Sequence, residues 1–184
     1  MIDYLIHFYR PGTEPFQNLS ALPEMSALRI MQDLYIEGSA MWERFKDPYD
    51  YLQARRRTEQ WLRKEFIVKG GDPRDSCPIY MVLGRSRWLL DAADAATLAA
   101  TAEIQIPLTI FGEDDVSFTC PDSMVSLMLA EQKDPEYFLP DYHGRLFTLS
   151  EIRAIVEANG LPGDGWGNLP EDLANYIEAQ VWNR

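Results

Sequence analysis

The sequence predicts an α+β fold: a mostly antiparallel sheet of about four to six strands, an N-terminal helical hairpin, and C-terminal helices packed on the sheet. Apolar and polar residues alternate over residues 2–9 and 103–111, which is the period-two pattern of strands. Apolar residues recur at helical spacing between residues 28 and 45. Capping signals return after residue 147, so helices are expected again near the end of the chain.

The first third of the chain is expected to form the helical hairpin. One helix is predicted from about Leu22 to Phe45, although Gly38 either divides it or lets another backbone approach closely. A second helix begins at Asp47-Pro48, because proline suits the first helical position, and it stops at Gly70-Gly71. The short connection between them predicts that the two helices pack against each other.

The middle of the chain is predicted to hold most of the sheet. A buried strand is expected over residues 78–84 and a small helix over residues 91–100. Pro107 removes a backbone donor from the strand over residues 103–111, which places that strand at an edge or at a bulge. Residues 116–119 and 124–129 are predicted to form a hairpin, with a helix over residues 124–130 as the alternative.

The last forty or so residues favour helices. Residues 145–147 are predicted as one more short strand. Thr148 and Glu151 have the spacing of a capping box, which predicts a helix that runs to Ala158. A last helix is expected over residues 170–182. No linker or internal repeat interrupts the sequence, so residues 1–184 are interpreted as a single globular domain.

The charge distribution is uneven. Residues 1–87 contain 13 basic and 12 acidic residues, whereas residues 88–184 contain 4 and 17. With a net charge of −12, the chain lacks the concentrated cationic surface that nucleic acids or anionic membranes require. No apolar run reaches the roughly 18 residues of a membrane-spanning helix, and the N-terminus does not resemble a signal peptide. A cytoplasmic protein without nucleic-acid or membrane partners is therefore expected.

The sequence contains no motif that specifies a reaction. The phosphate-binding, dinucleotide-binding, nucleophile-elbow and zinc-protease patterns are all missing, and no cofactor is expected. His7 is the candidate acid or base, because imidazole titrates near neutral pH. Three arginines that follow predicted strands are candidates for binding an anionic ligand: Arg10, Arg85 and Arg87.

Two further clusters are candidate sites. The basic island of Arg55, Arg56 and Arg57 is expected to be either a solvated helix face or a contact with an acidic partner, including another copy of the chain. Asp114, Asp115 and Asp122 would approach a divalent cation only if the predicted hairpin brought them together. A solvated acidic turn is the simpler interpretation, and no metal is expected.

Two classes of function follow from these observations. The first is a non-enzymatic binding or regulatory protein that self-associates, which the separated charges and the missing catalytic motifs favour. The second is a small enzyme or ligand-binding protein for an anionic or nucleotide-like metabolite. In that class His7 transfers a proton, and Arg10 or Arg85 holds the anion.

Overall fold

The computed structural model describes residues 2–39, 41–92, 101–171 and 173–183 and confirms the α+β class. Five strands form one sheet in the order β3-β1-β2-β5-β4, and all four pairings are antiparallel. The strands are β1 (Tyr4–Tyr9), β2 (Ile79–Leu83), β3 (Ala102–Pro107), β4 (Val116–Thr119) and β5 (Glu178–Val181). As Pro107 predicts, β3 lies at an edge of the sheet and ends at that proline.

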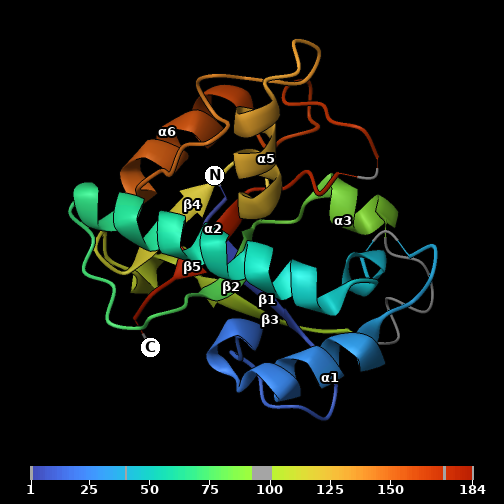
Figure 1. Ribbon diagram of the computed structural model, residues 1–184. Helices are drawn as coiled ribbons and strands as arrows, with labels where there is room; N and C mark the ends of the chain where they lie inside the picture. The colour runs from blue at the N-terminus through green and yellow to red at the C-terminus, as the bar shows by residue number, and fades with distance from the viewer. Residues whose placement is uncertain (1, 40, 93–100, 172, 184) are drawn as a thin grey trace.

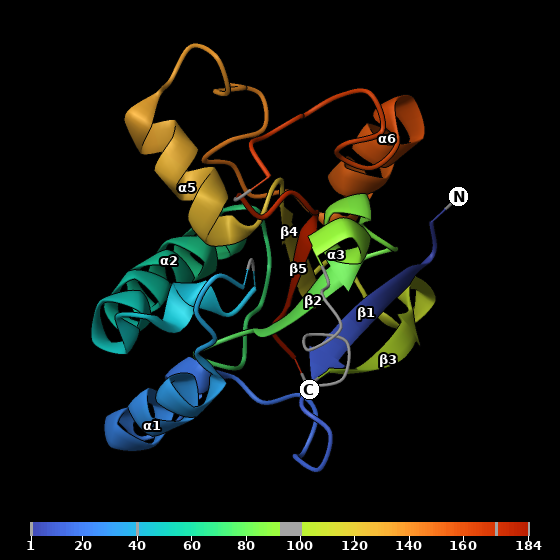
Figure 2. The ribbon, with the colours of Figure 1, turned by 90° about the vertical axis from the view of Figure 1, so that its right-hand side faces the viewer.

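Helices cover both faces of this sheet (Figures 1 and 2). The α-helices of the described residues are α1 (Glu24–Leu34), α2 (Pro48–Val68), α3 (Arg87–Ala92), α5 (Ser123–Gln132) and α6 (Leu149–Asn159). Short 3-10 turns occur at η1 (Leu19–Ala21), η2 (Glu43–Phe45) and η3 (Leu108–Ile110). Figure 2 shows α1, α2 and α5 on one side of the sheet and α6 on the other.

The strand register gives the two faces of the sheet different characters. On the face that packs against α6, the paired residues are apolar, as in the row Ile79, Val181 and Val116. On the face toward α2, the next row pairs Tyr80 with Gln180 and Gln180 with Ser117. Because side chains alternate between faces along a strand, this register collects polar side chains in the layer between the sheet and α2.

The helical hairpin is present with a shorter first helix than predicted. The first helix ends at Leu34, because Tyr35 is extended and Gly38 has a φ of +75° that ordinary residues adopt rarely. The second helix begins at Pro48, as predicted, and ends at Val68 just before Gly70 and Gly71. A β-carbon on Gly71 would lie 2.5 Å from the Phe66 ring, so this turn requires glycine.

Two segments differ from their predicted structure. Residues 124–129 belong to α5, so the hairpin was wrong and the alternative helix is confirmed; Asp122 caps it by accepting hydrogen bonds from Met124 N and Val125 N. Within 170–182, the described residues do not form a helix. They end in β5, which lies between β2 and β4 with all four of its residues buried.

Three further predicted elements can be compared with the structure. The capping box of Thr148 and Glu151 is present, and α6 runs to Asn159. The predicted strand over residues 145–147 reduces to a single bridge between Phe147 and Phe118. Of the helix expected over residues 91–100, only the start is described; it belongs to α3, which begins at Arg87.

Candidate functional site

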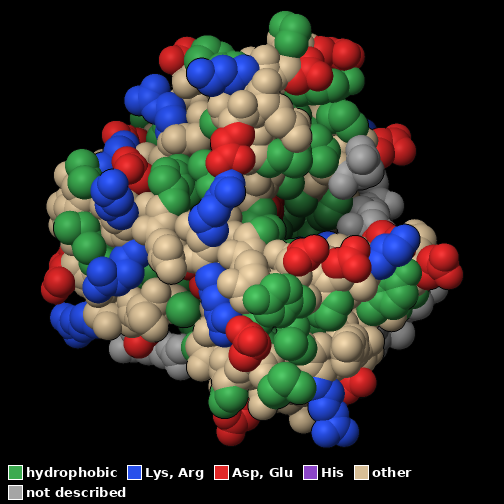
Figure 3. All heavy atoms as spheres, viewed as in Figure 1, with side chains coloured by type: hydrophobic (Ala, Val, Ile, Leu, Met, Phe, Trp, Pro, Cys, Tyr) green, Lys and Arg blue, Asp and Glu red, His purple; other side chains and the backbone are tan. Residues whose placement is uncertain are grey.

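A pocket opens on the polar face of the sheet, beside the N-terminal ends of α2 and α5. Its volume is about 140 Å³. Figure 3 shows the surface hollowed in this region, with hydrophobic side chains along the walls. Seven separate parts of the chain supply residues that line it: Phe8 from β1, Met41 and Arg44 before α2, Tyr51 and Arg55 from α2, Tyr80 from β2, Trp88 from α3, Asp122 at the start of α5, and Tyr176 and Glu178 at the start of β5.

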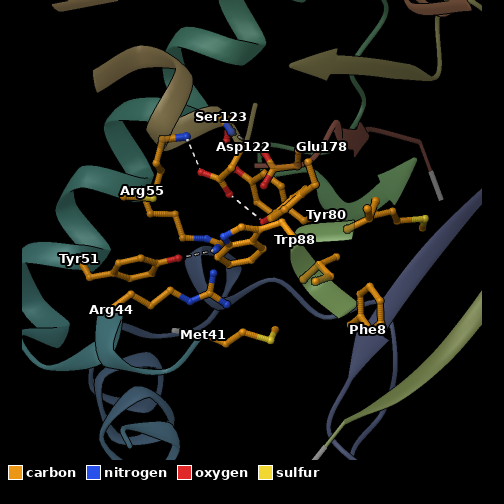
Figure 4. A pocket seen from close by; sticks show the side chains of 15 residues that line it. Phe8, Met41, Arg44, Tyr51, Arg55, Tyr80, Trp88, Asp122, Ser123 and Glu178 are labelled. Carbon is orange, nitrogen blue, oxygen red and sulfur yellow. Dashed lines mark hydrogen bonds between the residues drawn. The ribbon is translucent and has the colours of Figure 1, made fainter. Parts of the chain in front are cut away.

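Two arginines form the cationic side of the pocket (Figure 4). Arg55 is mostly buried: its Nε lies 3.3 Å from Glu59 Oε1, and its guanidinium donates a 3.2 Å hydrogen bond to the Tyr51 hydroxyl. The Arg44 side chain is exposed at the pocket and lies against the Phe45 ring, 5.2 Å from its centre. Within the described part of the chain, the Arg44 guanidinium has no carboxylate in ion-pair contact and makes no hydrogen bond.

A pair of carboxyl groups lines the opposite side of the pocket. Asp122 Oδ2 accepts a 2.9 Å hydrogen bond from the Tyr176 hydroxyl, while Oδ1 caps α5. Glu178 Oε1 accepts from Gln180 Nε2 at 3.0 Å and from Ser123 N at 3.3 Å. Burial, and then the neighbouring Asp122 carboxylate, raise the pKa of Glu178 well above its ordinary value, which favours its protonated form.

A chain of buried polar side chains supports this pair from behind. Trp182 Nε1 donates to Ser117 Oγ at 2.9 Å, and Ser117 Oγ donates to Gln180 Oε1 at 3.0 Å. Gln180 Nε2 then reaches both Thr119 Oγ1 and Glu178 Oε1. Because each buried group has a partner, the network holds Glu178 in one orientation at low energetic cost.

The arrangement is suited to binding a small polar molecule. Guanidinium groups recognise carboxylates and phosphates, and the aromatic side chains Phe8, Tyr51 and Trp88 offer flat apolar contact. Acidic and basic groups lie on opposite sides of the same pocket (Figure 4). Among the described residues, no group of three or more histidine, cysteine, aspartate or glutamate side chains has the spacing of a metal site.

His7, the predicted acid or base, is buried away from this pocket. Its Nε2 accepts a 2.8 Å hydrogen bond from Phe16 N, and its Nδ1 lies 3.1 Å from the carbonyl oxygen of Tyr80. The ring also stacks on Phe16, with the ring centres 4.7 Å apart. Burial lowers the pKa of His7, although the contact with the Tyr80 carbonyl opposes the shift. Both ring nitrogens therefore hold backbone groups in place.

The predicted anion-binding arginines do not line this pocket. Arg10 is exposed after β1, and Arg85 is half exposed and paired with Glu103 of the edge strand. Arg87 is exposed at the start of α3. The structure therefore places these three arginines at the surface, and it brings Arg44 and Arg55 together instead.

The basic island separates into three ion pairs within the chain. Arg55 pairs with Glu59, Arg56 with Glu24 of α1 at 2.7 Å, and Arg57 with Glu131 of α5 at 2.5 Å. The first pair lies within α2, and the other two link α2 to α1 and α5 on the same side of the sheet. Arg55 is the member of the island that also reaches the pocket.

The acidic trio is split by β4, and the predicted hairpin does not form. Asp114 and Asp115 precede β4, whereas Asp122 follows it at the pocket. Asp115 accepts hydrogen bonds from Asn183 Nδ2 and Gly112 N, and these bonds lower the pKa of its carboxyl group. Asp115 therefore acts within a turn, and only Asp122 belongs to the candidate site.

Sequence reasoning missed most of the residues in the pocket. Tyr176 and Glu178 lie in a segment that was predicted as a helix, yet that segment alternates: Ile177, Ala179 and Val181 face the apolar core. This period-two pattern was the available signal. Arg44 and Trp88 had no such signal, because only the tertiary fold brings them to the pocket.

None of the described helices combines the length and the apolar composition needed to cross a bilayer. No family model, curated protein or solved structure matches this chain.

Proposed function

We propose that this protein binds a small anionic molecule in the pocket between Arg44 and the aromatic side chains. One observation carries the proposal: Arg44 lines the pocket, and its guanidinium has no acidic partner among the described residues. A second cation, Arg55, lines the same pocket and shares its one carboxylate partner with Asn18 and Tyr80. A carboxylate or phosphate would supply the missing anion.

The dimensions of the pocket limit the size of the ligand. A volume of about 140 Å³ is close to that of an engineered cavity of about 150 Å³ that holds benzene. Most pockets for drug-sized ligands are larger, roughly 300–1,000 Å³. The ligand is therefore expected to contain about one ring or a short chain, with its anionic group beside Arg44.

Benzoate is the probe that matches this description, because it joins one ring to one carboxylate. We expect benzoate to raise the Tm of the protein, by an amount equivalent to about 2.7 kcal/mol at 100 times its Kd. Arg44→Met should weaken benzoate binding about tenfold or more, since it removes the charge and keeps much of the apolar stem. Calorimetric titration of both proteins measures the ratio.

Arg29→Met is the matched control, because Arg29 is exposed on α1 and does not line the pocket. It should bind benzoate as tightly as the unmodified protein. Equal losses in the two variants would assign the effect to net charge, and an unchanged affinity in Arg44→Met would refute the proposed site.

Self-association is a second proposal, and a groove between α2 and α5 favours it. This groove has a volume of about 280 Å³ and is lined by Met124, Val125, Leu127 and Met128, with the Arg57–Glu131 ion pair at its border. An apolar groove of this kind suits contact with a second copy of the chain.

Leu127→Lys should convert a dimer to a monomer in light scattering, because the lysine ammonium would have to be buried in the contact. Val68→Lys is the control, since Val68 is an exposed apolar residue of α2 outside the groove. A dimer that contacts through the apolar groove should persist at high salt. A dimer held instead by attraction between the basic and acidic surfaces of two copies, as the sequence predicts, should dissociate as salt screens the charges. A monomer under all conditions would refute self-association.

A further inference from the structure

We propose that the ligand of this pocket is a zwitterion, whose amine lies against Asp122 and Glu178 while its anionic group lies beside Arg44. This inference rests on the proposed function, and it adds the chemical class of the ligand. A simple anion beside Arg44 would leave the opposite side of the pocket, which holds the carboxyl groups of Asp122 and Glu178, without a ligand contact.

The carboxyl pair lacks a basic partner. Asp122 is 9% exposed and Glu178 is 5% exposed, and both line the pocket. No lysine, arginine or histidine among the described residues lies in ion-pair contact with either carboxyl group. Buried carboxyl groups are rare unless they are paired, so these two indicate a cationic ligand group.

The groups that hold the pair are neutral. Asp122 receives two backbone N–H groups and the Tyr176 hydroxyl, and Glu178 receives the Gln180 amide and one backbone N–H. Burial, followed by the effect of Asp122, raises the pKa of Tyr176 well above its usual value, so its hydroxyl remains protonated and donates. Neutral hydrogen-bond donors therefore fix the orientation of the Asp122 carboxylate. No cationic side chain among the described residues contacts it.

The charges of the two sides match those of a zwitterion. Burial and the adjacent Asp122 carboxylate raise the pKa of Glu178, so two full negative charges side by side are disfavoured. Arg55 is paired with Glu59, whereas Arg44 on the other side has no ion-pair contact among the described residues. In the view of Figure 4, Arg44 and Asp122 lie on opposite sides of the pocket. One ammonium and one anionic group on a short spacer complement both charges.

Two isosteric compounds test the inference. In 4-(aminomethyl)benzoate an ammonium replaces the terminal methyl group of 4-ethylbenzoate, so the pair differs in charge and hardly in shape. Calorimetric titration of the full chain should show that the amine compound binds about tenfold or more tightly. Asp122→Asn should remove this preference and leave the affinity for 4-ethylbenzoate unchanged, because asparagine also caps helices and preserves α5.

Asp141→Asn provides the control, since the Asp141 side chain is 87% exposed and lies outside the pocket. This variant should keep the full preference for the amine compound. A circular dichroism spectrum and a Tm within a few degrees of the unmodified protein establish that Asp122→Asn is folded.

The outcomes separate this inference from the proposed function. Equal affinity for the two compounds, or a preference that survives in Asp122→Asn, would overturn the zwitterion while benzoate binding through Arg44 stands. Binding of benzoate but of neither substituted compound would also overturn it, because the pocket would then not extend to the carboxyl pair. If benzoate and both substituted compounds fail to bind, the proposed function itself fails.

Discussion

Glu59→Ala is expected to lower the free energy of unfolding by about 3–5 kcal/mol, the cost of breaking a buried ion pair by removing one partner. Glu59 is 3% exposed, and its Oε1 is shared by three groups. It accepts hydrogen bonds from Asn18 Nδ2 at 3.0 Å and from the Tyr80 hydroxyl at 3.2 Å, and it lies 3.3 Å from Arg55 Nε. Alanine would leave all three without this acceptor, including one buried positive charge.

Chemical denaturation measures the loss, and two further variants identify its cause. Glu157→Ala should change stability by less than about 0.5 kcal/mol, because Glu157 is exposed on α6. The double variant Arg55→Met, Glu59→Leu should be more stable than Glu59→Ala, since replacing both charges with apolar groups removes the unpaired ion. A loss of under about 1 kcal/mol in Glu59→Ala would contradict the role of Glu59 as the central acceptor.

Trp182→Ala is expected to be similarly destabilising, by about 3–5 kcal/mol, because it empties a large volume in the core. Trp182 is completely buried and stacks on Phe66 of α2, with the ring centres 6.0 Å apart. Its Nε1 donates to Ser117 Oγ, the first link of the polar chain that ends at Glu178. The substitution therefore removes packing between α2 and the sheet together with one end of the network.

Trp182→Phe separates these two contributions. Phenylalanine keeps most of the packing but loses the N–H donor, so a smaller loss of about 1–2 kcal/mol is expected. Tyr49→Ala is the control, because the Tyr49 side chain is 55% exposed at the start of α2. Thermal unfolding followed by circular dichroism gives the order of stability. Near-equal Tm values for Trp182→Ala and Tyr49→Ala would contradict the assignment of Trp182 to the core.

Short sequence patterns correctly predicted the elements that are determined by residues close to one another in the sequence. Alternation located β1, Pro107 placed β3 at an edge, and the Thr148–Glu151 capping box located α6. In each case the deciding interactions lie within a few residues, so the sequence alone contains them. The start of α2 at Pro48 belongs to the same group.

Segments that depend on distant partners could not be predicted in the same way. β5 carries buried Glu178 and Gln180, which are unusual in a central strand and are stabilised by hydrogen bonds from Ser123 and to Thr119. α5 has almost no amphipathic pattern, because apolar residues occur on several of its sides; the Asp122 cap defines where it begins.

The candidate site was the least predictable part of the molecule. Two of its residues, Arg55 and Asp122, were singled out from the sequence, but for a partner contact and a metal site. The others come from β1, β2, α2, α3, α5, the region of η2 and the last strand, and only the folded chain brings them together. Charge and residue type indicated which chemistry was present, whereas the geometry of the site depends on strand order and register.

The central claim is that a small anion binds in the pocket beside Arg44. A crystal structure of the full chain with a brominated benzoate tests it directly, because anomalous scattering from bromine locates the ligand without ambiguity. The account predicts bromine inside the pocket, with the carboxylate within hydrogen-bond distance of the Arg44 guanidinium and the ring against Trp88. Bromine found only at other surfaces, with the pocket occupied by water alone, would contradict it.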